Sequence, residues 1–169
     1  ALIKILSEQN YNVYVTTRKD KTRENTERVH YLQGNAHDIA FITNALKNRK
    51  WDSVIDFMSY STAEFEERMH LFLNNTAQYV YISSARVYAE SEQLITEQSN
   101  RLLDTSTDEE YLQTDEYALA KARQENLLFN SLKNNWTVIR PSVTYNSNRL
   151  QLGVLEKEQW LYRALHGRT

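Results

Sequence analysis

The chain has 169 residues, a formal net charge of −2, no cysteine and 41% hydrophobic residues. This length suffices for one domain with a sizeable core, and no apolar run approaches a membrane span. Without cysteine the chain has no disulfides, iron–sulfur clusters or cysteine-ligated zinc, which fits a cytoplasmic protein. The charge gives no reason to expect nucleic acid as a partner, and four scattered histidines predict no metal site.

Apolar periodicity and β-branched runs predict helices and strands that alternate along the chain. In order we expect a helix at 2–6, strands at 13–17 and 29–32, a helix at 38–46, a strand at 54–58, a helix at 62–74, a strand at 79–82, a helix at 116–132, a strand at 136–139 and a helix at 155–166. The strand at 54–58 is apolar enough to be buried on both faces. The polar stretch 90–115 is predicted to be a loop with room for short helical turns.

This alternation predicts an α/β fold with a Rossmann-like, doubly wound parallel sheet. Right-handed crossovers place the C-terminal ends of all strands at one edge, where ligands of open α/β sheets bind. Arg18, Ser83-Ser84 and Arg140 each follow an expected strand, so we expect them at this edge.

Tyr117 and Lys121 lie four residues apart in the longest expected helix and therefore share a face. A phenol with the ordinary pKa near 10 is a poor base, and a nearby ammonium favours its ionised form. The pair therefore suits proton transfer, and the lysine also suits the hydroxyls of a cofactor ribose. With eleven tyrosines in the chain, chance accounts for this spacing equally well.

The hydroxyl at Ser84 follows an apolar strand directly. It suits a hydrogen bond to a substrate oxygen, and it suits equally a serine that ends its strand by bonding to its own backbone. The chain has no G-x-S-x-G elbow, and no histidine or acid pairs with Ser84, so nucleophilic hydrolysis is disfavoured.

Two further sites suit a dinucleotide. Asp38 suits an adenine amino group, a helix N-cap, or both. Arg18 and Lys19 stand where folds selective for NAD usually place an acid, which favours NADP. A solvated charged loop explains these two cations as well.

Three segments resemble the motifs of the extended short-chain dehydrogenases/reductases, the NAD(P)-dependent epimerase/dehydratase family: residues 79–88, the pair Tyr117-x-x-x-Lys121, and Arg140-Pro141. The resemblance implies that Ser84, Tyr117 and Lys121 are catalytic. It also implies cofactor contacts from Asp38, Ile39, Met58, Ser59, Tyr60, Lys121, Pro141 and Ser142.

The function implied by the resemblance is an NAD(P)-dependent epimerase or reductase that acts on a nucleotide sugar, with homodimerisation as one assembly it allows. Family members that dehydrate sugars carry an Asp-Glu pair where this chain has Ala85-Arg86, so dehydration is disfavoured. The alternative is a non-catalytic binding protein of the same fold that binds RNA or senses redox state.

No glycine precedes Gly34, whereas the family places a strand and a glycine-rich, phosphate-binding turn first. We therefore expect these to precede Ala1 and the substrate lobe to follow Thr169. We also expect the 169 residues alone to bind dinucleotide poorly and to be inactive. Residues 1–146 would form the NAD(P)-binding domain, and residues 147–169 the start of the substrate-binding lobe. We also expect unpaired edges on the strands at Val13 and Val54.

Overall fold

The computed structural model describes residues 1–47, 49–144 and 155–168. It divides into two compact units, which are described separately: an N-terminal unit of residues 1–54 and 67–79, and a C-terminal unit of residues 55–66 and 80–169. The expected domain boundary at 146/147 lies outside the described residues. In the parts that the structure describes, no helix combines the length and the apolar character needed to cross a membrane.

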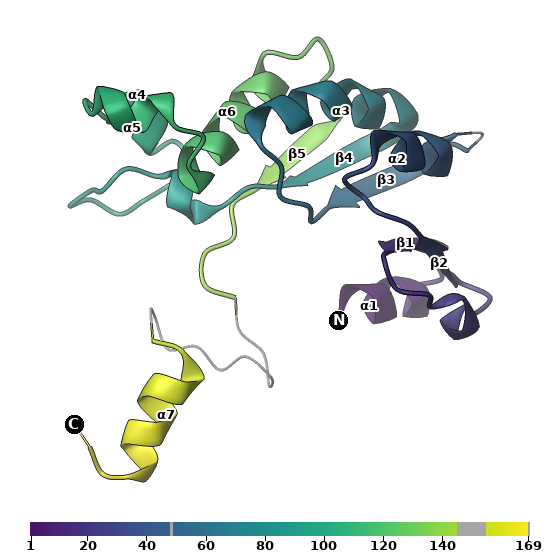
Figure 1. Ribbon diagram of the computed structural model, residues 1–169, viewed down its shortest axis with the longest axis horizontal. Helices are drawn as coiled ribbons and strands as arrows, with labels where there is room; N and C mark the ends of the chain where they lie inside the picture. Colours follow the sequence, from purple (N-terminus) through teal and green to yellow (C-terminus); the bar gives the residue numbers. More distant parts are fainter. Residues whose placement is uncertain (48, 145–154, 169) are drawn as a thin grey trace. The chain divides into compact units, whose positions relative to one another are not determined.

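Helices and strands alternate as the sequence predicts (Figure 1). The elements are α1 (Leu2–Glu8), β1 (Val13–Thr17), η1 (Thr22–Glu24), β2 (Val29–Gln33), α2 (Ile39–Leu46), β3 (Trp51–Asp56), α3 (Thr62–Asn75), β4 (Thr76–Ile82), η2 (Ala85–Val87), α4 (Leu102–Thr105), α5 (Glu109–Gln113), α6 (Tyr117–Phe129), β5 (Trp136–Ile139) and α7 (Lys157–Leu165). The short helices α4 and α5 occupy the expected loop at 90–115.

The main errors of the sequence prediction concern strand ends. The strand expected at 54–58 begins at Trp51 and ends at Asp56. It ends there because the Asp56 carboxylate accepts a hydrogen bond from the backbone N–H of Met58 at 3.0 Å, which turns the chain. The strand expected at 79–82 begins at Thr76, directly after α3.

The N-terminal unit contains β1 and β2, which pair in parallel. The backbone N–H of Gly34, just after β2, donates to the carbonyl of Thr17 at the end of β1 at 2.8 Å. A Cβ at Gly34 would lie 2.2 Å from the ring of Phe41 on α2, so only glycine allows this close approach. The N-terminus of α2 is capped by Asp38, as the sequence predicts.

The strands β3, β4 and β5 form a second sheet in that order. The backbone N–H groups of Ser83 and Ala85 donate to the carbonyls of Ile139 and Pro141 at 2.8 and 2.9 Å. From the first bond to the second, the residue number rises by two on both segments, so β4 and β5 run parallel. Parallel sheets with flanking helices confirm the predicted Rossmann-like fold.

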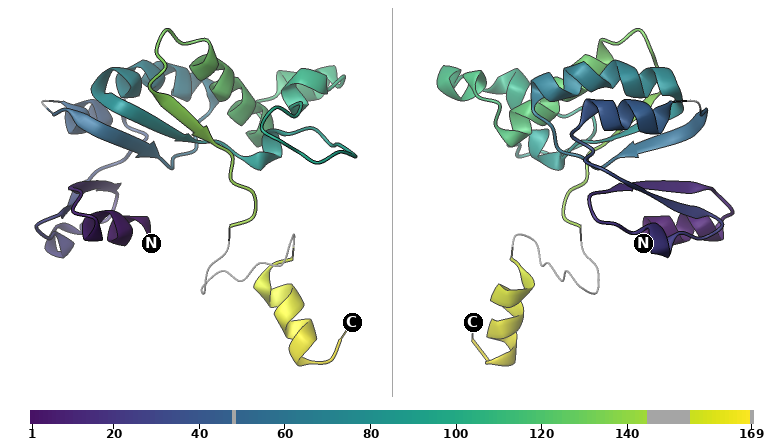
Figure 2. Two further views of the ribbon diagram at one scale, coloured as in Figure 1. Left: turned by 180° about the vertical axis from the view of Figure 1, so that it is seen from behind. Right: turned by 45° about the vertical axis from the view of Figure 1, so that its right-hand side comes forward.

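One face of the β3–β4–β5 sheet is covered by α3 and α6 (Figures 1 and 2). Tyr79 and Tyr81 lie two residues apart on β4, so their side chains point to the same face. Tyr79 stacks on Phe72 there, and the ring centroids of Tyr81 and Phe65 lie 4.9 Å apart. All four side chains are buried. These aromatic contacts bind α3 to the middle of the sheet.

Among the described residues β1 pairs only with β2, and β3 pairs only with β4. The expected unpaired edges are therefore present in both sheets. The expectation that residues 54–58 are buried on both faces is wrong, because β3 is an edge strand and Phe57 is 67% exposed.

We expect Phe65→Ala to lower the free energy of unfolding by about 3–5 kcal/mol, because the ring is fully buried against Tyr81 and leaves a cavity. Urea unfolding at neutral pH measures this loss. Phe57→Ala is the matched control and should change stability by no more than about 0.5 kcal/mol. Equal losses for both variants would contradict this description of the core.

Candidate active site

The helix α6 carries three polar side chains that are almost fully buried, namely Lys121, Gln124 and Glu125. A buried polar or charged group is costly unless it is hydrogen-bonded. Each of the three finds its partners on the strands or strand ends that α6 covers. This buried polar face therefore determines how the strand ends are held.

Gln124 joins two of these segments. Its amide NH₂ donates to the carbonyl of Tyr60 at 2.8 Å, and its amide oxygen accepts from the hydroxyl of Tyr81 at 2.6 Å. Burial raises the pKa of the Tyr81 hydroxyl, and the negative charges of Glu125 and Asp56 raise it further. Tyr81 is therefore a neutral donor that holds α6 on β4.

The ammonium of Lys121 is buried at the C-terminal end of β4. Its Nζ donates to the carbonyl of Ile82 at 2.8 Å and lies 4.7 Å from the centroid of the Tyr81 ring. Burial lowers the pKa of Lys121, while the carboxylates of Asp56 and Glu125 oppose this shift. One of the three ammonium donors binds Ile82, so the group retains donors for the hydroxyls of a ligand.

Tyr117 begins α6, and its side chain is 41% exposed. Its ring centroid lies 6.0 Å from Lys121 Nζ and 5.4 Å from the guanidinium carbon of Arg86. Glu116 caps the helix by accepting from the N–H of Ala118 at 2.7 Å, and it also pairs with Arg86 at 3.1 Å. Tyr117 is therefore accessible to a ligand and flanked by two cations.

Ser84 follows β4 directly and is nearly buried. Its Oγ accepts a hydrogen bond from the backbone N–H of Arg86 at 3.2 Å and so caps η2. The strand-ending role considered from the sequence is thus present. Because this bond uses only the oxygen as an acceptor, the hydroxyl proton remains for a ligand oxygen.

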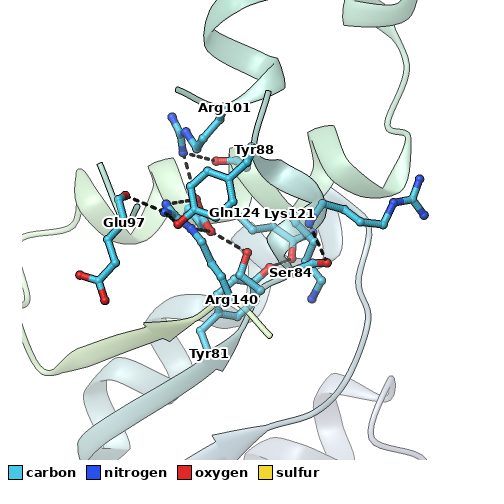
Figure 3. A network of polar contacts seen from close by, with 12 residues as sticks. Tyr81, Ser84, Tyr88, Glu97, Arg101, Lys121, Gln124 and Arg140 are labelled. Atoms are coloured by element: carbon cyan, nitrogen blue, oxygen red, sulfur yellow. Dashed lines mark hydrogen bonds and ion pairs between the residues drawn. The ribbon is translucent and has the colours of Figure 1, made fainter. Parts of the chain in front are cut away.

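Arg140 ends β5 and binds the carboxylate of Glu125 with two parallel hydrogen bonds, both at 2.8 Å (Figure 3). Its third nitrogen, Nη1, donates to the hydroxyl of Tyr88 at 2.8 Å and to the carbonyl of Glu97 at 3.0 Å. The hydrogen bonds to Glu125 raise the pKa of Arg140 most, and the hydrogen bond to Tyr88 raises it further. Arg140 is therefore a fixed structural cation at the strand end.

The remaining candidates of the C-terminal unit lie on the same strand ends. Ser59 is exposed in the loop after β3, and Tyr60 is buried with its carbonyl bonded to α6. Met58 is held by its N–H bond to Asp56. Pro141 accepts the N–H bond from Ala85, and Ser142 is exposed beside it.

Three predicted cofactor residues belong to the N-terminal unit. Arg18 is exposed just after β1. Asp38 accepts from the N–H groups of Ala40 and Phe41 through Oδ1, at 2.8 and 3.3 Å, so its N-cap role is realised. Ile39 is half-buried at the start of α2.

Sequence reasoning missed Gln124 and Glu125. A signal for them was present, because Glu125 lies four residues after Lys121 and eight after Tyr117, on the same helix face. An acid on the helix face that carries the candidate site suits a cation from a strand end, and Arg140 was already expected at that edge.

The segment before Tyr117 is anchored to α3 by Asp115. Its carboxylate accepts from the N–H and the hydroxyl of Thr62 at 2.8 and 2.6 Å, which caps α3, and it pairs with Arg123 at 3.3 Å. Burial alone would raise the pKa of Asp115, but the Thr62 hydrogen bonds and the Arg123 charge outweigh it and lower the pKa. Within the residues described, no cluster of three or more histidines and acids is arranged for a metal ion.

Comparison with known proteins gives a family and a fold. The model of an NAD-binding family described as male sterility protein matches residues 65–168. The Bordetella bronchiseptica enzyme WbmH in complex with NAD+ is a similar solved structure, with a TM-score of 0.67 and 15% identity over 98% of this chain and 58% of that one.

Two similar structures are UDP-glucose 4-epimerases. One has a TM-score of 0.55 and 19% identity over 82% of this chain and 46% of that one. The other, from Bifidobacterium longum in complex with NAD+ and UDP, has a TM-score of 0.53 and 19% identity over 80% and 47%. The chain thus spans about half the length of the solved structures it matches. No curated protein matches the chain by sequence.

We expect Asp115→Ala to lower the free energy of unfolding at neutral pH by about 1–2 kcal/mol, because α3 loses its cap. The folded pKa of Asp115 lies below the ordinary 3.8, so its stabilisation is present above 3.8 and is lost as the pH falls through the folded value. The stability difference between wild type and variant should therefore narrow in acid.

Urea unfolding between about pH 5 and pH 2 measures this difference. The exposed Asp52 is the matched control, and Asp52→Ala should leave stability nearly unchanged at every pH. A gap between wild type and Asp115→Ala that stays constant or widens in acid would show that the Asp115 carboxylate is not the stabilising group.

Proposed function

The chain belongs to the NAD-binding male sterility protein family, and from this premise we propose that it carries the proton-transfer residues of an NAD(P)-dependent oxidoreductase. Membership confirms the predicted resemblance to extended short-chain dehydrogenases/reductases. The observation that carries the proposal is the pair on α6, where an accessible Tyr117 lies over the buried ammonium of Lys121 on one helix face.

Each residue has a role that its surroundings support. Tyr117 exchanges a proton with a substrate hydroxyl or carbonyl oxygen, since its ring is exposed and flanked by cations. Lys121 places a positive charge 6.0 Å from the centroid of the Tyr117 ring and donates hydrogen bonds to ribose hydroxyls. Ser84 donates its free proton to the same substrate oxygen and so orients the reacting carbon.

The donors of the C-terminal unit fit a nicotinamide dinucleotide. A bound dinucleotide supplies the hydride acceptor or donor. Lys121 keeps free ammonium donors beside its bond to Ile82, and the segments Met58–Tyr60 and Pro141–Ser142 follow β3 and β5 at their C-terminal ends. In the N-terminal unit Asp38 and Ile39 would contact adenine, and Arg18 would hold a 2′-phosphate, which favours NADP.

We propose a nucleotide sugar as the substrate class, processed by epimerisation or reduction. Support comes from the fold shared with two UDP-glucose 4-epimerases. Ala85 and Arg86 stand after Ser84 where a sugar dehydratase needs two acids, so the elimination of water is not proposed. The intact trio of Ser84, Tyr117 and Lys121 favours catalysis over a purely binding role.

In the full-length protein that contains this chain, we expect Tyr117→Phe to reduce turnover of a nucleotide sugar by about two to four orders of magnitude, because the acid/base is lost. Dinucleotide affinity should stay nearly unchanged, since Lys121 keeps its donors. Steady-state kinetics and calorimetric titration measure the two quantities. The exposed Tyr11 is the matched control, and Tyr11→Phe should change neither turnover nor dinucleotide affinity. Near-normal turnover in Tyr117→Phe would refute the assigned role.

We expect Arg18→Ala to weaken NADP binding about tenfold and NAD binding much less, because a charge-assisted bond to phosphate is lost. Fluorescence titration with both reduced dinucleotides measures the two affinities. Arg23→Ala, a matched change in the same loop, should affect neither. Equal losses for NAD and NADP would contradict the phosphate-binding role.

A further inference from the structure

Glu125 carries a fully buried carboxylate and has no role in the chemistry proposed above. It receives hydrogen bonds from three side chains on three separate segments. Arg140 binds both oxygens at 2.8 Å, Arg101 Nη1 binds Oε2 at 3.1 Å, and Ser83 Oγ binds Oε1 at 2.6 Å. The Glu125 carboxylate therefore joins α6 to the ends of β4 and β5 and to the segment before α4.

Arg101, which directly precedes α4, makes several hydrogen bonds besides the one to Glu125. Arg101 also donates to the carbonyl of Ala122 at 3.2 Å and to the side-chain oxygen of Asn126 at 2.8 Å, both on α6. Asp104 pairs with it at 2.8 Å, and this hydrogen bond lowers the pKa of Asp104. With Arg140, the cluster holds two cations and two anions, namely the buried Glu125 and the exposed Asp104, so its charges balance.

Two of the three partners of Glu125 are direct neighbours of proposed site residues in the sequence. Ser83 precedes Ser84, and Arg140 precedes Pro141-Ser142. Glu125 itself lies one helical turn after Lys121. A shift of the carboxylate would therefore move the substrate-facing strand ends relative to α6.

We propose that Glu125 is a positioning residue, which sets the ends of β4 and β5 against α6 and thereby fixes Ser84, Lys121 and the nicotinamide-side segment. This proposal rests on the proposed function, because that function assigns Ser84 and Lys121 to the active site. Glu125 does not touch a ligand, because its side chain has no exposed surface. It acts through Ser83 and Arg140.

The same carboxylate supports the charge of Lys121. Burial disfavours the ammonium, and two carboxylates oppose this: Asp56 from β3 and Glu125 from α6. The other groups that face Lys121 are the rings of Tyr81 on β4 and Tyr117 on α6. The loss of the Glu125 charge should therefore lower the pKa of Lys121, which a mere packing defect would not do.

The test compares the full chain with Glu125→Gln, which keeps the shape and removes the charge. Carbon-13 NMR of the lysine ε-carbons, assigned with Lys121→Arg, follows the titration of Lys121, and calorimetry measures NADP and NAD affinity. Glu92→Gln, an exposed site in the same unit, is the charge-matched control. Ser83→Ala removes one contact to Glu125 and leaves every charge in place.

In Glu125→Gln we expect Lys121 to titrate at a lower pH than in the wild type and the dinucleotides to bind about tenfold more weakly. In Ser83→Ala the affinity should fall without a shift in titration, and Glu92→Gln should match the wild type. A folded Glu125→Gln protein with a lower unfolding temperature, but wild-type titration and affinity, would reduce Glu125 to a structural brace and overturn the proposal.

If Glu125→Gln does not fold, Ser83→Ala decides the question, since wild-type affinity in that variant also overturns the proposal. If the wild type binds neither dinucleotide, the proposed function fails. The Lys121 titration then decides the positioning proposal alone: a shift in Glu125→Gln supports it, and no shift overturns it.

Discussion

The fold of the C-terminal unit depends on the need to pair a buried polar helix face. Lys121, Gln124 and Glu125 lie in a protein interior, where each unpaired group would cost more than most single apolar contacts contribute. Lys121 and Gln124 bond to β4, Gln124 also bonds to the loop after β3, and Glu125 bonds to the ends of β4 and β5. The position of α6 must satisfy all of these bonds together. The geometry at the strand ends follows from this requirement rather than from shape complementarity alone.

The electrostatics of the site follow from the same pairing. Two arginines neutralise Glu125, and the carboxylates of Glu125 and Asp56 help to keep Lys121 charged in a desolvated place. The Lys121 ammonium lies 6.0 Å from the centroid of the exposed Tyr117 ring, and the guanidinium carbon of Arg86 lies 5.4 Å from it. A structural network and a proposed proton-transfer pair thus share one helix.

The sequence predicted the features that depend on local spacing. The alternation of elements, the cap at Asp38 and the shared helix face of Tyr117 and Lys121 all follow from residues a few positions apart. It missed the start of β3, where Asp52 and Ser53 are polar because the strand is an edge. It also missed the Glu125 pairs, whose partners lie 15 and 24 residues away and meet only in the folded chain.

The most direct test of this account is a crystal structure of the protein grown with NADP+ or NAD+. The account predicts that the ribose hydroxyls of the nicotinamide half accept hydrogen bonds from Lys121 Nζ, which keeps its bond to the carbonyl of Ile82. Tyr117 and Ser84 should face the open side of the nicotinamide, and the Glu125 network should be unchanged. A dinucleotide that binds without contacting Lys121 or approaching Tyr117 would contradict the account.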